Sequence, residues 1–304
     1  MLYLPQPITL ENNMNPVQTF EITSWEEAFP PALQNQAISA LESGQVLFLP
    51  HLSFNLSPTE TRFLSPMWSD GKSKNISYDG QAIKGAQGAE SDLEQLKTMI
   101  ARFANQSTRL VADLFPKYVP HLGHGRTSFR PFEVEQRASS YKKDDKRLHV
   151  DAFPSRPTHG ERILRVFANI NPDNRPRIWR VGEPFESLAN HYLPQIKQPF
   201  PGSAWLMDKL GITKGRRSEY DHIMLNLHDK MKADMDYQKN GPQQELALPA
   251  GCAWIVFSDQ VLHAAMSGQY MLEQTFHLPL TALHNQQTAP LKVLERLTGR
   301  PLVA

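Results

Sequence analysis

The sequence predicts a mainly β protein with helices, built around a double-stranded β-helix (jelly-roll) core. Short apolar runs between turn residues fill positions 125–185 and return at 243–283, as expected for two sets of core strands. A helical pattern at 186–242 separates the two sets, and further helical patterns precede them. The 24 prolines indicate many turns and argue against a helical bundle. An α+β protein with an open sheet is the alternative.

A length of 304 residues suits one large domain or two small ones, and we expect a single domain. Helical and strand elements are expected at 1–124, ahead of the core strands. The helical insertion at 186–242 interrupts the core, and a C-terminal helix is expected within 284–304.

The N-terminal region contains a predicted helix followed by a strand. Ser24 and Glu27 have the spacing of a capping box, and the helix is expected to continue to about position 41. Gly44 ends it, and the apolar run "QVLFLP" follows as a strand. Positions 52–90 are polar and contain many turn residues, a pattern typical of a functional or mobile loop.

The clearest helical pattern lies at 91–115. Its apolar residues recur at helical spacing, which predicts a face packed against the core. Ser91 and Glu94 again have the spacing of a capping box.

Strand patterns dominate after position 125, with one further helix predicted over 220–237 and a last one from Pro290 to Gly299. The strands are predicted within "ASSYKK" (138–143), "RLHVDAF" (147–153), "ERILRVFANI" (161–170), "RIWRVG" (177–182), 245–267 and 270–280.

Bulk properties exclude several classes of protein. The net charge of +1 provides no general basic field, so nucleic acid is not an expected partner. The single cysteine, Cys252, excludes an internal disulfide and a cysteine-rich zinc site. The N-terminus lacks the pattern of a signal peptide, and no window reaches the roughly 18 apolar residues that a membrane span requires.

The run "RLHVDAF" carries the first candidate site. Alternation along a strand places His149 and Asp151 on the same face, where two polar groups between apolar neighbours need a partner such as a metal ion. His263 is the best third ligand, because it follows an apolar strand 112 positions after Asp151. His277, on another predicted strand, is the second choice. A buried, hydrogen-bonded His–Asp pair without metal is the alternative.

Two histidines and one carboxylate leave several positions of an octahedral ion open. This arrangement is typical of non-haem Fe(II) oxygenases, which bind a co-substrate and dioxygen on the open face. Such enzymes commonly use 2-oxoglutarate, whose far carboxylate requires a cation.

The candidates for this contact are argued from position. The segment after His263 contains no Arg or Lys where a cation is expected, and Gln274 stands there instead. Arg165 is flanked by Leu164 and Val166, and a buried guanidinium needs an anion, either the co-substrate or a protein carboxylate. Arg162 on the same strand and Tyr141 on the preceding one complete the set of candidate co-substrate contacts.

A basic patch, Lys214, Arg216 and Arg217, lies within the insertion. We expect it to bind phosphate or carboxylate groups of the substrate. A solvated turn before a helix is the alternative.

The chain resembles the Kdo 3-hydroxylase family, Fe(II)- and 2-oxoglutarate-dependent dioxygenases of Gram-negative bacteria. Several long blocks between 137 and 300 carry the resemblance: "SYKKDDKRLHVDAFPSRPTHGERILRVFANINP", "RIWRVGEPFE", "LGITKGRRSEYDHIMLNLHDKMKAD", "PAGCAWIVFSDQVLHAAMSGQY" and "LEQTFHLPL". The family motif places the metal ligands on His149, Asp151 and His263.

The resemblance also implies a reaction and a substrate. The family hydroxylates carbon 3 of 3-deoxy-D-manno-oct-2-ulosonic acid (Kdo) in the inner core of lipopolysaccharide, with Fe(II), 2-oxoglutarate and O2. The acceptor is Kdo-bearing lipid A. We therefore expect a cytoplasmic protein with transient contact to the inner membrane surface, where the 220–237 helix is a candidate contact. An oxygenase for another sugar, lipid or small molecule, and a non-catalytic glycan-binding protein, are the alternatives.

Overall fold

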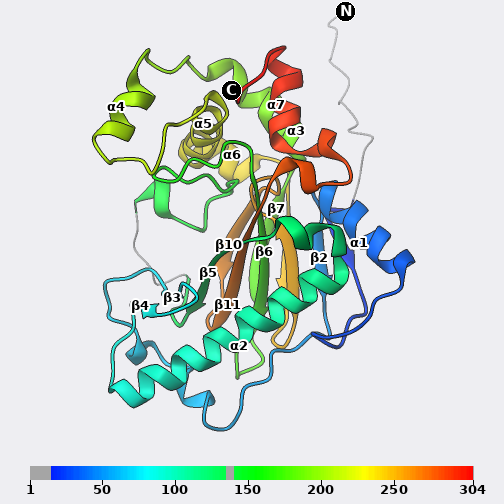
Figure 1. The fold of residues 1–304 in the computed structure, drawn as a ribbon, viewed down its shortest axis with the longest axis vertical. Coiled ribbons are helices and arrows are strands. Elements are labelled where there is room, and N and C mark those ends of the chain that lie inside the picture. The colour runs from blue at the N-terminus through cyan, green and yellow to red at the C-terminus, as the bar shows by residue number, and fades with distance from the viewer. Residues whose placement is uncertain (1–14, 135–139, 304) are drawn as a thin grey trace, which may run out of the picture.

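The computed structural model describes residues 15–134 and 140–303, and within them two β-sheets pack face to face (Figure 1). The larger sheet has eight strands. In spatial order they are β1 (Val17–Thr19), β2 (Val46–Leu49), β9 (Ala253–Phe257), β6 (Arg162–Asn169), β11 (Met271–Leu278), β5 (Gly123–Arg130), β3 (Ile76–Tyr78) and β4 (Ile83–Lys84).

The smaller sheet has three strands, in the order β10 (His263–Ser267), β7 (Arg177–Gly182) and β8 (Gln243–Leu248). Pairing is antiparallel in both sheets except between β1 and β2, which run parallel. The two sheets do not close into a barrel. This arrangement confirms the predicted jelly-roll core with helices around it.

An aromatic cluster fills the space between the sheets. The rings of Phe167 on β6 and Trp254 on β9 stack with centroids 5.0 Å apart. Trp179 on β7 of the smaller sheet meets both rings edge-on, at 5.2 and 5.4 Å. These contacts combine apolar burial with the preferred geometry of aromatic pairs, so they hold the two sheets at a defined separation.

Helices α1 (Pro31–Glu42) and α2 (Glu90–Leu114) cover the outer face of the larger sheet, with α2 running across it in Figure 1. Phe103 and Leu110 of α2 share a core with Val166, which projects from the outer face of β6. The helical stripe predicted over 91–115 is therefore confirmed as a core-packing face.

The remaining helices gather at one end of the sheets (Figure 1). Buried side chains of α3, α5 and α7 form a separate core with Leu148 and Val150, which flank His149. This core holds the segment that carries His149 and Asp151 against the insertion. The helices are α3 (Phe185–Tyr192), α4 (Ser203–Lys209), α5 (Glu219–Ala233), α6 (Met235–Asn240) and α7 (Pro290–Thr298).

Both predicted capping boxes in the N-terminal half are wrong. Helix α1 begins at Pro31, and the Ser24 hydroxyl instead bonds to the carbonyl of Glu26. Helix α2 begins at Glu90 after Ala89, which has no capping side chain. The last helix is confirmed, and it ends at Gly299 with the left-handed φ of 70° that glycine accommodates.

The predicted 220–237 helix is divided in two, because Asp234 ends α5 and its carboxylate caps α6 by accepting from the Tyr237 N–H. The strand predicted at 138–143 is also wrong. Tyr141–Lys143 form a 3-10 turn, while positions 138 and 139, like 1–14, lie outside the described residues.

The segment 147–153 forms one β-bridge and no regular strand. The polar segment at 52–90 contains β3, β4 and two 3-10 turns, at Thr61–Phe63 and Pro66–Trp68. Among the described residues, no helix is both long and apolar enough to cross a bilayer.

Candidate metal centre and its pocket

A pocket of about 490 Å³ opens between the inner faces of the two sheets. His149, Asp151 and His263 line it together, and it falls in the size range of about 300–1,000 Å³ that is usual for small-molecule sites. In all, seven cationic and three anionic side chains line it, Asp151 included, which is an excess of four positive charges with neutral histidines. Because the whole chain carries only +1, this charge is concentrated at the pocket.

Backbone pairing brings the two histidines together. His149 and His263 form an antiparallel bridge, with N–H to O=C distances of 3.0 and 2.9 Å between their backbones. The N–H of Asp151 bonds to the carbonyl of Ser258 at 2.8 Å. The segment carrying two of the candidate ligands is thus attached to the turn and strand carrying the third.

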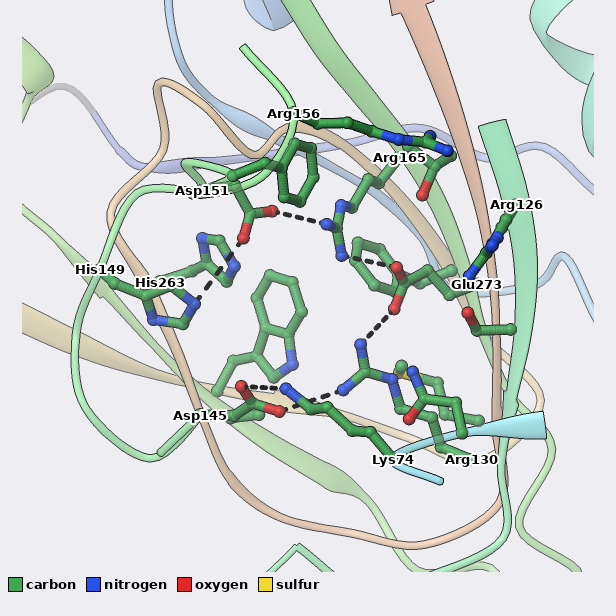
Figure 2. A pocket seen from close by; sticks show the side chains of 18 of the residues that line it. Lys74, Arg126, Arg130, Asp145, His149, Asp151, Arg156, Arg165, His263 and Glu273 are labelled. Atoms are coloured by element: carbon green, nitrogen blue, oxygen red, sulfur yellow. Dashed lines mark hydrogen bonds and ion pairs between the residues drawn. The ribbon is translucent and has the colours of Figure 1, made fainter. Parts of the chain in front are cut away.

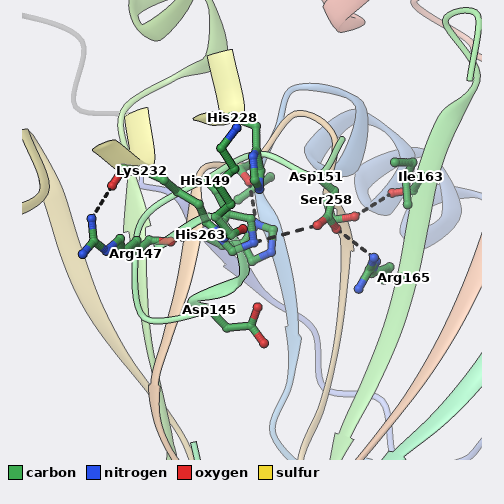
Figure 3. A network of polar contacts seen from close by, with 12 residues as sticks. Asp145, Arg147, His149, Asp151, Ile163, Arg165, His228, Lys232, Ser258 and His263 are labelled. Atoms are coloured by element: carbon green, nitrogen blue, oxygen red, sulfur yellow. Dashed lines mark hydrogen bonds and ion pairs between the residues drawn. The ribbon is translucent and has the colours of Figure 1, made fainter. Parts of the chain in front are cut away.

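The helical insertion holds the same segment from the other side. Arg147 donates to the carbonyl of Lys232 on α5, a contact drawn in Figure 3. The Gln238 side chain of α6 accepts from the N–H of Leu148 and donates to its carbonyl. Backbone groups that would be unpaired outside a regular strand are therefore satisfied.

The donor atoms of His149, Asp151 and His263 lie close enough to share one ion, all within 4.8 Å of one another. The imidazole Nδ1 of His149 contacts the carbonyl of Arg147 at 2.7 Å, and that of His263 contacts the carbonyl of Val261 at 2.9 Å. A carbonyl only accepts, so each Nδ1 carries the proton and each Nε2 keeps a free lone pair. These residues therefore fit a metal ion.

The electrostatics also suit metal binding. Burial, and then the neighbouring His263, hold the pKa of His149 well below its usual value, and burial lowers the pKa of His263. Both imidazoles are therefore neutral near pH 7, as ligands must be. Burial alone would raise the pKa of the Asp151 carboxyl, but Arg165 and the two imidazoles outweigh it and keep the pKa below its ordinary value.

Opposite charges alternate along the pocket wall (Figure 2). Each charged group in this chain of ion pairs is neutralised by its neighbours, which makes the burial of several of them possible. The N···O distances are 2.5–3.1 Å, in the order Asp151, Arg165, Glu273, Arg130, Asp145 and Lys74. We call these six side chains the charge chain.

Arg177 stands apart from the charge chain. It is only 2% exposed, and its guanidinium donates to the backbone carbonyl of Gly268 at 3.2 Å. Burial, and then the charge of Arg130, lower its pKa to about 10. Among residues 15–134 and 140–303, no carboxylate forms an ion pair with it. A buried cation of this kind favours an anionic ligand.

The structure brings His149, Asp151, His263 and Arg165 together as predicted from the sequence. His277 also lines the pocket, but it is not one of the three clustered donors. The ring of His228 packs edge-on against His149, with centroids 5.6 Å apart.

Three of the four residues predicted to contact the co-substrate do not line the pocket. Gln274 projects from the other face of β11 and accepts from the Thr127 hydroxyl. Tyr141 is 40% exposed on its 3-10 turn and does not line the pocket. The structure places neither side chain at the pocket, because strand alternation and the turn direct them elsewhere.

Arg162 lies three residues before Arg165 and faces away from the pocket. It is fully buried and donates to Asp259 and Gln260, each at 2.6 Å. Its guanidinium also lies 3.8 Å from the ring centroid of Phe257. Asp259 and Gln260 belong to the turn between β9 and β10, and Phe257 ends β9. This turn supplies the carbonyls of Ser258 and Val261 to the metal site. Arg162 thus holds this turn.

The three residues of the predicted basic patch do not lie together in the structure. Lys214 lines the pocket, whereas Arg216 and Arg217 do not. Arg217 donates to the carbonyl of Pro154, and the carbonyl of Arg216 contacts the His159 ring at 2.8 Å. These two residues brace the loop that follows Asp151. They touch the pocket only through that loop.

Several residues that line the pocket were not predicted from the sequence. Glu273 interrupts an apolar strand in the same way as Arg165, so the sequence alone could have identified it as a candidate pocket residue. Arg177 begins a strand, where a charged residue is unremarkable. Lys74 comes from the polar segment at 52–90, and nothing in its sequence neighbourhood distinguishes it from a solvated lysine.

Comparisons with known proteins agree with this geometry. A family model described as 3-deoxy-D-manno-oct-2-ulosonic acid (Kdo) hydroxylase matches residues 24–301. A comparison with curated proteins returned no significant match.

Solved structures of the Kdo hydroxylase KdoO, a non-haem Fe(II) alphaketoglutarate-dependent dioxygenase, are similar throughout. The complex with alphaketoglutarate and Fe(III) has a TM-score of 0.91 and 52% identity, covering 95% of this chain and 97% of that one. The cobalt(II) complex has a TM-score of 0.93 and 52% identity, covering 95% and 98%. The complex with succinate and Fe(III) has a TM-score of 0.91 at the same identity, covering 95% and 98%.

The position of Arg162 leads to a prediction. Arg162→Gln leaves the buried Asp259 carboxylate without its cation, so the free energy of unfolding should fall by about 3–5 kcal/mol. Because the same turn holds Asp151 and His263, Co(II) affinity of the folded variant should fall as well. Urea unfolding and Co(II) titration measure the two effects. The exposed Arg109→Gln is the control, and undiminished Co(II) affinity in a folded Arg162→Gln protein would contradict the role of the turn.

Proposed function

The chain belongs to the Kdo hydroxylase family, and we infer that it is an Fe(II)- and 2-oxoglutarate-dependent dioxygenase acting on Kdo. The observation that carries this conclusion is the convergence of His149, Asp151 and His263 in a pocket with excess positive charge. Two imidazoles and one carboxylate are the ligand set of non-haem Fe(II) oxygenases. Both the co-substrate and the sugar acid are anions, which explains the charge of the pocket.

The residues divide the work between holding the metal and holding its ligands. Nε2 of His149, Nε2 of His263 and the Asp151 carboxylate would hold the ion. When bound, Fe(II) with 2-oxoglutarate and dioxygen supplies the oxidising chemistry that converts a C–H bond into C–OH. The guanidinium of Arg165 lies 3.0 Å from Oδ2 of Asp151 and so holds the carboxylate in place. The indole of Trp179 stacks on the His263 ring at 5.1 Å and covers that side of the centre.

Arg177 is the best-supported anchor for the far carboxylate of 2-oxoglutarate. Arg165 was the choice from the sequence, but Asp151 and Glu273 already neutralise it. Arg177 is buried, lines the same pocket and has no such partner among the described residues. A carboxylate beside it would relieve the repulsion between Arg177 and Arg130, and a guanidinium can bind that group bidentately.

The site of hydroxylation and the acceptor molecule can be specified further within this proposal. Family membership supports hydroxylation at carbon 3 of Kdo, with Kdo-bearing lipid A as the acceptor. Lys214 lines the pocket and would meet an anionic group of such a molecule. This acceptor supports a cytoplasmic location with peripheral contact at the inner membrane.

The apolar surface of the insertion supports contact with a lipid surface. Five large apolar side chains between positions 200 and 212 are exposed, with Phe200 at 85%. Helix α4 buries none of its residues, and in Figure 1 it projects beyond α5, away from the sheets. The five residues, which we call the apolar patch, are Phe200, Trp205, Leu206, Leu210 and Ile212.

The charge around the apolar patch fits an anionic lipid surface. Lys209 ends α4, and Lys214 and Arg216 follow within the same loop and are exposed. Apolar side chains flanked by cations are the combination that binds at the headgroup boundary. Helix α5, the candidate from the sequence, is a poorer one, because Ile223, Leu227 and other apolar side chains along it are buried.

Loss of a metal ligand tests the function directly. His149→Ala and Asp151→Ala should abolish Kdo-dependent release of succinate and hydroxylation of Kdo, because two ligands hold the ion poorly. Mass spectrometry of the sugar and a succinate assay measure the result. Arg109→Gln, an exposed arginine on α2 that contacts none of the three donors, serves as the control. Normal Kdo hydroxylation by either ligand variant would contradict the assignment.

Removal of the proposed anchor should affect the co-substrate selectively. Arg177→Gln should raise the KM for 2-oxoglutarate by at least about tenfold, the effect of losing a charge-assisted hydrogen bond. Co(II) binding should persist because the three metal ligands remain. Steady-state kinetics with varied 2-oxoglutarate measure the change, and an unaltered KM would remove Arg177 from this role.

The apolar patch predicts binding to vesicles. Trp205→Ser combined with Leu206→Ser should weaken cosedimentation with phosphatidylethanolamine–phosphatidylglycerol vesicles by at least about tenfold, because two exposed apolar side chains lose their burial in lipid. Met67→Ser is the matched control, since Met67 is 66% exposed on a different part of the surface. Equal binding by the double variant and the control would argue against this contact.

A further inference from the structure

The cations that line the pocket fall into two sets. Lys74, Arg130 and Arg165 belong to the charge chain, and Arg177 is buried beside them. The second set is exposed and lies outside the charge chain. It comprises Arg126 on β5, Arg156 in the loop after Asp151, and Lys214 in the loop after α4.

The second set occupies a different part of the pocket. In Figure 2, Arg126 and Arg156 lie across the pocket from His149 and His263, beyond Arg165. Within the described residues, none of Arg126, Arg156 and Lys214 forms an ion pair with a carboxylate. Three like charges from separate segments thus line one cavity, and no ion pair within the described residues neutralises them.

Resting on the proposed function, we propose that Arg126, Arg156 and Lys214 form a second anion-binding subsite, distinct from the anchor of the co-substrate. It binds an anionic oxygen group of the acceptor, either the carboxylate of the sugar acid or a phosphate of its lipid. The subsite positions the acceptor by its charge while the metal end of the pocket holds the co-substrate.

The surroundings of the subsite suit a carboxylate or phosphate. Thr275 and His277, at the end of β11, line the same pocket and offer neutral polar groups. Burial lowers the pKa of His277, the charge of Glu161 opposes this, and the charge of Arg156 adds to it, so Arg156 acts on this end of the pocket. Guanidinium groups on two sides of an opening can bind different oxygens of one anion.

The position of the subsite also explains how two anions share one pocket. The co-substrate must reach the metal donors, and Arg177 is the buried cation available to it. An acceptor entering from solvent meets the exposed cations first. Cations at an opening raise the local concentration of an anionic ligand, and their contribution weakens as salt is added.

The test compares acceptor and co-substrate kinetics in the full-length enzyme. Arg126→Gln and Arg156→Gln should each raise the KM for Kdo-bearing lipid A about tenfold, and the double variant should raise it further. The KM for 2-oxoglutarate and acceptor-independent succinate release should stay within about twofold of the unmodified enzyme. Arg156→Lys should recover part of the loss, and Arg109→Gln, an exposed arginine on α2, is the control.

Two acceptors distinguish the sources of the anion. If the sugar carboxylate is bound, the variants lose affinity equally for phosphorylated and phosphate-free Kdo-bearing lipid. If a lipid phosphate is bound, they lose affinity for the phosphorylated acceptor alone. Either pattern supports the subsite.

Two results would count against the subsite. An unchanged acceptor KM in both variants would overturn it, as would parallel increases in the KM for acceptor and for 2-oxoglutarate. Absence of Kdo hydroxylation by the unmodified enzyme would instead contradict the proposed function.

Discussion

The two hydrogen bonds between the backbones of His149 and His263 are the interaction on which the metal centre depends. Residues 147–153 form no regular strand, so this bridge and the bond from Asp151 to Ser258 place the segment against the smaller sheet. The helical insertion contacts the same segment from the opposite side, through hydrogen bonds with Arg147 and Leu148. Arg162 secures the turn that offers the carbonyl groups. The geometry of the three donors is therefore a property of both sheets and the insertion together, and no single strand determines it.

Charge is the second constraint on the pocket. The charge chain balances three carboxylates against three cations, which keeps Asp151 ionised and available while Glu273 is buried. What remains is a set of cations without carboxylate partners in the described structure. Arg177 is a buried residue of the pocket lining, and the others are exposed. The division between balanced and unbalanced charges is what separates structural ion pairs from sites that can receive an anionic ligand.

Much of this could be predicted from the sequence, and the failures have a common physical cause. His149 and Asp151 were identified because alternation places them on one face, and His263 because it follows a buried strand. Arg162 and Arg165 could not be separated, since alternation says that they face opposite sides but not which side is the pocket. For the same reason, the sequence could not show that Gln274 faces away from the pocket. Lys74 and Arg177 are recognised only after segments far apart in sequence meet. The family and its reaction came from long sequence blocks and not from such local patterns.

The distance along the chain between the donors has a consequence for biogenesis. His149 and His263 are separated by 114 positions, with the entire insertion between them. During synthesis the ribosome releases the first two donors well before the third, so an emerging polypeptide offers only an incomplete chelate. Such long-range closure is slow compared with local folding. The three donors meet only once both sheets have formed, so an unfolded chain cannot present the complete ligand set.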